Sequence, residues 1–350
     1  MALCAFGRLF TGKTASKPVK FLRGVRQKRH ARYSGSMTRL LALLRARLML
    51  LAAVFAALLA PFGTPALARP HRAPAAGAHA AAAHAARPAL WVVRRGAASL
   101  YLFGTIHLMT KDADWFAGPV AQGFNASDTL VTEIIEGNQD EMRQLLMARA
   151  LLPEGQSLRD GLSPATRAGY DKAMAANGLP AAAFDRFKPW FAALSLVNVP
   201  LLHAGFDPAS GVDAILAARA QSAGKAHEAL ETPAFQFGLF DNLPTAAQQR
   251  YLAEVVKNLP TLTRDMHQVI GAWRAGRTAQ IARLVNTEDD DPELRQSLLV
   301  ERNRSWASWI DQRLAKPGTT FVAVGAGHLA GRDSVLDRLK AMGISATRLQ

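Results

Sequence analysis

The sequence predicts one α/β domain with a mixed central sheet, flanked by many helices, whose strands come from both ends of the folded region. Runs rich in β-branched and aromatic residues occur at 90–103 and again at 319–324, and such runs are typical of strands. The long region between them is rich in Ala and Leu and is punctuated by prolines, which indicates helices. One run from each end finishes in the same pattern of Gly, two residues, His and Leu. We therefore expect strands that are distant in sequence to share one sheet.

Turn signals bound each expected strand. The first is a hairpin, because two β-prone runs flank an Arg-Arg-Gly turn. The second is an apolar run that ends near Glu133. In chain order the expected strands are the hairpin over 90–103, then 128–135, 225–232, 319–324 and an edge strand at 345–349.

Helices are expected over 138–222 and 244–315 and after the last long strand. Apolar side chains on the last helix before 319 recur at spacings of zero, three, four and eight residues, which places them on one face, and Pro317-Gly318 ends that helix. The final helix ends before Gly343, a typical position for glycine. The first helical region is expected to break at Pro153, Pro164, Pro180, Pro189, Pro200 and Pro208; the apolar faces of the last two helices comprise Trp306, Trp309, Ile310 and Leu314, and Val335, Leu336, Leu339 and Met342.

The positive charge is confined to the front of the chain. The formal net charge is +15, but residues 1–68 hold twelve of the 42 Lys and Arg and none of the 27 Asp and Glu, so the remainder carries only +3. This distribution argues against nucleic acid as a partner. Basic residues, an apolar run at 48–62 and Ala66-Leu67-Ala68 form the pattern of a secretory signal. We expect translation to start at Met37, cleavage after Ala68 and a periplasmic or secreted protein.

The mature chain is expected to begin with a linker. Residues 69–88 are rich in Ala, His and Pro and lack aromatic and β-branched residues, so they cannot bury a core. The folded domain is then 89–350, with no membrane span, since the apolar run at 48–62 is too short and is removed. The single cysteine, Cys4, lies in the removed part, which excludes thiol chemistry, disulfides and Cys-based zinc sites.

The two Gly-x-x-His elements carry the first functional hypothesis. They are Gly104–His107 and Gly325–His328, and each follows an apolar strand and precedes Leu. A third match, Gly224–His227, follows a polar segment and is attributed to chance. Ligand sites in α/β sheets lie beyond the carboxyl ends of strands, so two adjacent strands would bring the two imidazoles together. Imidazole nitrogens suit Zn, Mn, Fe, Co or Cu, and a catalytic site needs a carboxylate as well.

Two glutamates are candidates for that carboxylate. Glu133 and Glu231 both lie at the ends of strand-like segments, and a glutamate among apolar neighbours needs a partner. In one assignment Glu133 is the metal ligand; in the other Glu133 serves as the general base and Glu231 is the ligand. Arg302 and Asn303 begin the helix that contains Trp306, and they can bind a carboxylate or stabilise an oxyanion. The simpler interpretations are salt bridges, helix caps and a surface charge.

Several segments in matching order resemble the TraB/GumN (TraB/PrgY/GumN, Tiki-related) family. The resemblance covers about 89–348. It implies a fold similar to the erythromycin-esterase and ChaN-like group, and a divalent-metal hydrolase like the membrane-tethered Tiki proteases. The tether has no counterpart in this chain, which lacks a carboxyl-terminal apolar span. The motif residues that it carries over are His107, Glu133, Arg302, Asn303 and His328. The segments are "YLFGTIHLM", "VTE", "FKPWFAAL", "GVDAIL", "ALET", "AWRAG", "ERN" and "GAGHLAGRDSVLDRLKAMG".

Three functional interpretations follow. In the first, the chain is an exported, divalent-metal-dependent hydrolase acting on a peptide or protein, with Mn, Co or Zn held by His107, His328, Glu133 and Glu231. In that interpretation Glu133, Arg302 and Asn303 are the catalytic residues. In the second, the same pocket binds haem, a metal or a peptide without chemistry. In the third, both histidines are structural and cap strand ends.

Overall fold

The computed structural model describes residues 86–111, 114–286 and 291–350. The expected signal segment, the possible start at Met37 and nearly all of the 69–88 linker lie outside these residues. In the described residues no helix has the length and apolar character needed to cross a membrane.

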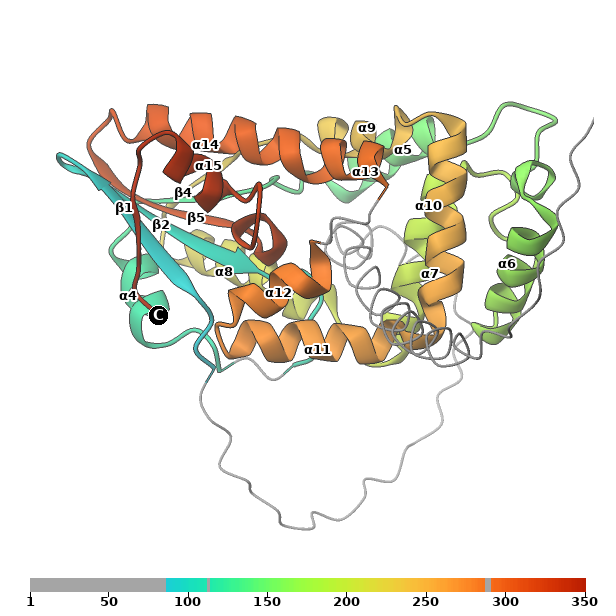
Figure 1. Cartoon of the computed structure of the whole chain (residues 1–350), viewed down its shortest axis with the longest axis horizontal. Helices are drawn as coiled ribbons and strands as arrows, with labels where there is room; N and C mark the ends of the chain where they lie inside the picture. The colour runs from blue at the N-terminus through green and yellow to red at the C-terminus, as the bar shows by residue number, and fades with distance from the viewer. Residues whose placement is uncertain (1–85, 112–113, 287–290) are drawn as a thin grey trace, which may run out of the picture. The chain divides into compact units, whose positions relative to one another are not determined.

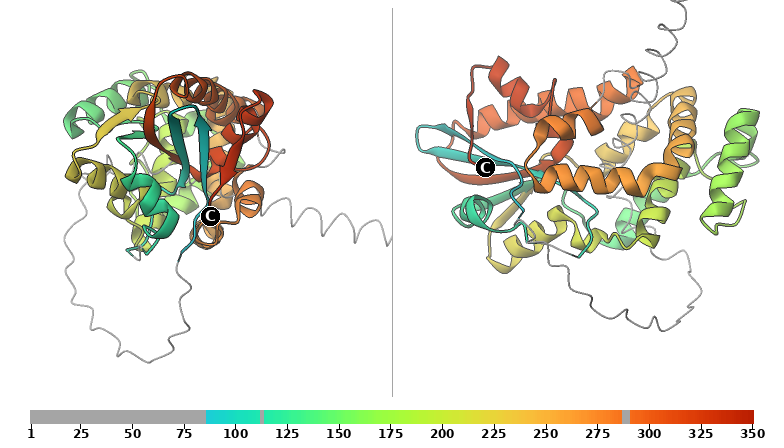
Figure 2. Two further views of the ribbon diagram at one scale, coloured as in Figure 1. Left: turned by 90° about the vertical axis from the view of Figure 1, so that its left-hand side faces the viewer. Right: turned by 60° about the horizontal axis from the view of Figure 1, so that its bottom comes forward.

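A six-stranded mixed sheet forms the centre of the domain, in the order β4-β3-β5-β2-β1-β6. Strands β4, β3, β5 and β2 run parallel, while β1 pairs antiparallel with both β2 and β6. The strands from the two ends of the domain thus lie side by side (Figures 1 and 2), as the sequence predicts. The strands are β1 (Leu90–Arg95), β2 (Ala98–Thr105), β3 (Thr129–Thr132), β4 (Ala226–Ala229), β5 (Gly318–Gly325) and β6 (Ala346–Arg348).

Helices occupy most of the chain between β3 and β5, and in the described residues one further helix precedes β3 and another follows β5. They are α4 (Gly118–Asn125), α5 (Gln139–Ala150), α6 (Pro164–Ala176), α7 (Pro189–His203), α8 (Val212–Ser222), α9 (Pro233–Asp241), α10 (Thr245–Asn258), α11 (Leu262–Arg274), α12 (Thr278–Val285), α13 (Pro292–Arg295), α14 (Glu301–Arg313) and α15 (Val335–Ala341). Short helical turns are η2 (Leu158–Gly161), η3 (Pro208–Ser210), η4 (Leu259–Thr261), the π-helical turn η5 (Gln296–Val300) and η6 (Ala326–Leu329).

The alternation of side chains along each strand divides the core between the two faces of the sheet. Val322 and Val324 of β5 pack with Trp306 of α14, and α15 completes this layer. Phe321 and Ala323 point to the opposite face, where α4, α7, α8, α11 and α12 pack. Figure 1 shows α14 and α15 on one side of the sheet and α11 and α12 on the other. These two helical layers cover the faces of the sheet, and the carboxyl ends of the parallel strands form the site.

The helix predictions need three corrections. Pro200 does not break the first helical region but lies inside α7, where the packing of Leu196 and Leu201 in the core outweighs the one lost backbone hydrogen bond. Helix α9 was not predicted, although Thr232-Pro233 is a helix-start signal and the Thr232 hydroxyl accepts from Phe235 N. Met342 lies beyond the end of α15 and is 44% exposed, so it is not part of the buried face.

Candidate active site at the carboxyl ends of the parallel strands

The two Gly-x-x-His elements meet because β2 and β5 are adjacent and in register. Gly104 pairs with Val324 and Thr105 with Gly325, so both strands end at the same level. Each His follows its strand end by two or three residues. A Cβ on Gly104 would lie 3.0 Å from Ala326 Cα, so glycine allows the two strand ends to approach closely.

His107 is held by the amino-terminal end of α8. Its Nδ1 lies 2.6 Å from Asp213 Oδ2, which assigns a proton to Nδ1 and leaves Nε2 to face the site. The backbone supports this contact, since Val212 N donates to Ile106 O at 2.9 Å. A Cβ on Gly211 would lie 2.1 Å from His107 O, so this approach requires glycine. The segment Gly211–Asp213 therefore positions His107.

His328 is held differently. Its Nδ1 lies 2.6 Å from Asn303 Oδ1, and the Asn303 amide nitrogen donates to Asp333 O at 2.8 Å. Since the Asn303 oxygen can only accept, His328 carries its proton on Nδ1, and its Nε2 accepts from Arg302 Nη1 at 3.1 Å. The ring also lies against Trp306, with 4.5 Å between ring centroids. In this arrangement both nitrogens of His328 have protein partners.

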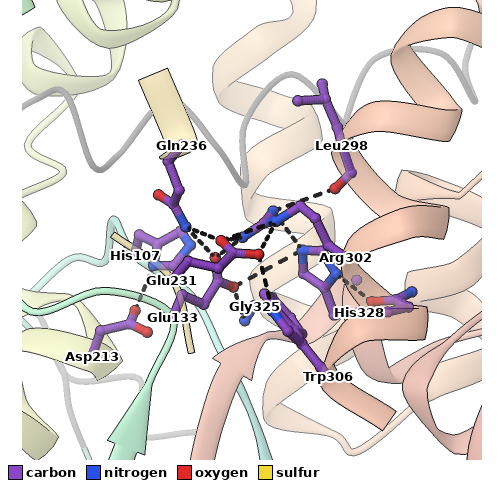
Figure 3. Close-up of polar contacts among 12 residues, drawn as sticks. His107, Glu133, Asp213, Glu231, Gln236, Leu298, Arg302, Trp306, Gly325 and His328 are labelled. Carbon is purple, nitrogen blue, oxygen red and sulfur yellow. Dashed lines mark hydrogen bonds and ion pairs between the residues drawn. The ribbon is translucent and has the colours of Figure 1, made fainter. Parts of the chain in front are cut away.

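Arg302 joins the two glutamates. Its Nη2 donates to Glu133 Oε2 at 2.6 Å and to Glu231 Oε2 at 2.8 Å, and its Nε donates to Glu231 Oε1 at 2.9 Å. Trp306 Nε1 and Gln236 Nε2 each donate a further bond to Glu231, at 2.9 Å. Arg302 is 1% exposed, so the interpretation of a surface charge is excluded. Figure 3 shows the guanidinium between the carboxylates and His328.

Gly325 marks the point where the groups converge. A Cβ at this residue would lie 3.2 Å from Glu133 Oε1, 3.5 Å from His328 Cδ2 and 3.7 Å from His107 Nε2. The backbone nitrogen of Gly325 donates to Glu133 Oε1 at 2.7 Å. The space beside the strand end therefore contains one carboxylate and both imidazoles.

The charges in the site are set by burial and by these contacts. Burial opposes ionisation of Glu133, but Arg302 and the two histidines hold the pKa of its carboxyl well below its usual range. Burial likewise opposes the imidazolium of His107, but Asp213 and Glu133 raise the pKa of His107 to about 9. Burial and the neighbouring Arg302 lower the pKa of His328 to about 3. At neutral pH, with no metal bound, Glu133 is ionised, His107 is protonated and His328 is neutral.

A groove of about 610 Å³ opens beside His107 and Glu133. Its lining includes the acidic side chains of Asp213 and Glu136, and also Lys225 and His227. The remaining wall comes from the end of β3, the segment after it, η3 and α8: Thr132, Ile134, Ile135, Pro208, Ala214, Ala217, Ala218 and Gln221.

The structure brings together all six residues that the sequence singled out, namely His107, Glu133, Glu231, Arg302, Asn303 and His328. Two partners were missed. Asp213 lies in the segment GVDAIL, which resembles the family. An aspartate in the first turn of a helix is common, so its position did not indicate the contact with His107. Gln236 lies on α9, the helix that was not predicted, and donates to both glutamates.

The donor types suit a divalent metal ion at His107 and Glu133. His107 Nε2 faces the site while Nδ1 bonds to a carboxylate, which is the usual arrangement of a metal-ligating histidine. His328 Nε2 and the Glu231 oxygens instead bind Arg302. Consistent with this, no cluster of three or more His, Cys, Asp or Glu arranged for metal binding occurs in the described part of the chain. The fit therefore rests on His107 and Glu133, while Glu231 and His328 hold Arg302.

A comparison with protein-family models identifies the family. The model of the TraB/PrgY/gumN family matches residues 89–348. An uncharacterized protein of Treponema pallidum (strain Nichols) is 22% identical over 269 residues, which cover 71% of this chain and 79% of that protein. No solved structure matches the chain.

Proposed function

Because the chain belongs to the TraB/PrgY/gumN family, we propose that it is an exported hydrolase of peptide bonds whose reactive groups are His107 and Glu133. The observation that supports this most strongly is their convergence at Gly325. The Glu133 carboxylate and the His107 nitrogen lie within 3.7 Å of one point, beside a groove of about 610 Å³. Export rests on the sequence pattern of residues 37–68.

The two groups have complementary charges for this chemistry. Environments that push the pKa values of two neighbouring groups apart are typical of acid and base partners. The ionised Glu133 orients the attacking water and takes up its proton, which replaces the proton that His107 gives to the leaving amine. The Nε2 proton of His107 is directed at the developing oxyanion of the substrate carbonyl and then at the leaving amine.

A divalent metal ion is part of this proposal through the same two residues. Held by His107 Nε2 and Glu133, in place of the His107 proton, a Mn, Co or Zn ion would lower the pKa of a bound water and polarise the carbonyl. Every polar side-chain atom of Arg302 and of Asn303 has a partner in the protein. With or without the metal, Arg302 therefore positions Glu133, and Asn303 orients His328.

Hydrolysis is tested by incubating the purified chain with quenched fluorescent peptides, after chelation and after reloading with Mn, Co or Zn. We expect His107→Ala to lose activity by at least about two orders of magnitude. The control is His267→Ala, because His267 is exposed and lies outside the site. Full activity of His107→Ala, or peptides left uncut under every metal condition, would contradict the proposal.

Binding of haem or a metal without chemistry is the alternative. His107 is the histidine of the site whose Nε2 is available, so a Soret band that appears with haem and is lost in His107→Ala would favour that alternative.

A further inference from the structure

Strand β4 is an edge of the sheet, and its outer side carries unpaired backbone groups. It pairs with β3, and among the described residues no strand pairs with its other side. Ala226 N donates to Asp128 O and Leu230 N donates to Thr132 O, so alternate residues of β4 face β3. The N–H and C=O groups of His227 and Ala229 therefore face outward.

Strand β4 itself, with the sequence Ala-His-Glu-Ala, contains neither lysine nor proline. Natural sheets guard an edge with lysine, proline, a bulge or a covering element. Lys225 stands at the start of β4, but its amine turns inward and donates to the carbonyl oxygens of Asn125 and Ser127. The outer edge of β4 is consequently available to an extended chain.

The groove beside His107 includes a residue of this same strand in its wall. The β4 residues in its wall are His227 and its neighbour Lys225, and the opposite wall is one face of α8. That face presents Ala214, Ala217 and Ala218, whose small side chains leave room for a side chain of a bound segment. His227 of β4 and the reactive groups His107 and Glu133 therefore line one groove, and Asp213 of α8 bonds to His107 within it.

The charges at the two ends of the groove give it a direction. Asp213 bonds to His107, and Glu136 interacts with both. Lys225 instead precedes β4 at the opposite end of the strand, where its amine binds the carbonyl oxygens of Asn125 and Ser127 and leaves a positive charge beside them. A polypeptide whose amino-terminal side points to His107 would complement both ends. It would run antiparallel to β4, which is the slightly more stable way for two strands to pair.

We propose that β4 and its groove bind an extended polypeptide segment by strand addition, antiparallel to β4 and with its amino-terminal side toward His107. This inference rests on the proposed function, because it specifies how the substrate polypeptide is held. Main-chain bonds to His227 and Ala229 supply affinity, and the alanine face of α8 limits the size of the side chain above it.

The main-chain bonds are tested with Ala229→Pro. Proline removes an outward N–H, and it is tolerated at an edge strand because the bonds to β3 come from the neighbouring residues. The probe is a short fluorescein-labelled peptide of alternating Thr and Ala with lysine at its amino end, followed by fluorescence anisotropy. We expect Ala229→Pro to weaken binding about tenfold. Glu228→Ala changes an exposed side chain of the same strand, keeps the backbone amide, and is expected to change binding less than about twofold.

The groove is tested with Ala218→Trp, which fills the space beside β4. We expect loss of peptide binding, whereas Ala165→Trp, on an exposed site of α6, should bind like the parent chain. A peptide with lysine moved to the carboxyl end should bind more weakly than the original peptide. Thermal unfolding of each variant shows that it is folded.

Equal binding by Ala229→Pro and the parent chain, or equal binding of the two peptides that differ in the position of the lysine, would overturn the inference. A dimer of the parent chain that Ala229→Pro dissociates would also overturn it, because β4 would then pair with a second copy.

His107→Ala separates this inference from the proposed function. It leaves β4 and Lys225 unchanged, so it should bind the peptide while failing to cut it. A variant that binds and still cuts contradicts the proposed chemistry and leaves strand addition standing. If His107→Ala loses hydrolysis and Ala229→Pro binds the peptide as the parent does, the proposed chemistry is supported and strand addition is overturned.

Discussion

Arg302 Nη2 lies 2.6 Å from Glu133 Oε2, and the two side chains are 0% and 4% exposed. The pair is therefore an interior ion pair, and Glu231 at 2.8 Å completes it as a triad. An ion pair removed from water depends on every partner, because the charge left behind by a deletion has no solvent to stabilise it. Arg302 thus fixes the positions of Glu133 and Glu231, and none of its own N–H groups is free to bind a substrate.

Removal of Arg302 should destabilise the protein strongly. We expect Arg302→Met to lower the free energy of unfolding by about 3–5 kcal/mol, because two buried carboxylates lose their common counterion. Chemical denaturation measures this change. The control is Arg250→Ala, which breaks a pair in which the arginine side chain is 54% exposed and should cost less than about 1 kcal/mol. Similar losses in the two variants would show that the triad is not a stabilising unit.

Two glycines of the site should respond differently to alanine. Gly211→Ala places a Cβ against the backbone oxygen of His107, which cannot move aside, so we expect a loss of about 1–3 kcal/mol in stability. Gly325→Ala places its Cβ against side-chain atoms of Glu133 and His328, and the residue has φ near −48°, which alanine adopts readily. Its stability should change by less than about 1 kcal/mol while peptide hydrolysis falls. Denaturation curves and the peptide assay, run on both variants, distinguish these outcomes.

Stability should be greatest near pH 6–7 in the presence of a chelator. His328 has a folded-state pKa of about 3, below the unfolded value of about 6.5, so the unfolded chain binds the extra proton and stability falls as the pH drops below about 6.5. His107 has a folded-state pKa of about 9, so its contribution is fully present below about 6.5 and is lost as the pH rises toward 9. Melting temperatures recorded across this range check both limbs. His107→Gln should flatten the alkaline limb and His328→Gln the acid limb; an unchanged alkaline limb in His107→Gln would contradict the assignment.

Asn286 should act as a positioning residue for the second histidine. Its side-chain nitrogen donates to Gly327 O at 2.6 Å and to Ala330 O at 2.7 Å, which ties η6 to the end of α12. We expect Asn286→Ala to cost about 1–3 kcal/mol and to speed amide exchange at residues 326–330. Hydrogen exchange read by mass spectrometry measures this effect. Exchange at the His107 segment is the internal reference, and equal acceleration in both segments would indicate global destabilisation instead.

The sequence was informative about the strands and about the two histidines. Strand-like runs, each followed by Gly-x-x-His, predict the ends of β2 and β5 correctly because alternation and a strand-ending glycine are local signals. Pro200 misled the prediction, since a proline is a local signal whose effect the buried packing of α7 overrides. Asp213 could not be recognised, because nothing near it in sequence indicates that it meets a residue 106 positions away.

By itself the sequence determined the strand-rich ends, the helical middle, the family and the residue types available for chemistry, since these depend on local periodicity, composition and motif order. Only the tertiary structure decided how those residues are used. The order of the sheet places Glu133, Glu231 and both histidines at the carboxyl ends of the parallel strands. Burial makes Arg302 the counterion of the two glutamates. Contacts across the sheet then leave one histidine nitrogen facing the groove and occupy the other histidine completely. Such pairings join residues from 25 to 169 positions apart, and they depend on packing between segments that local sequence patterns do not encode.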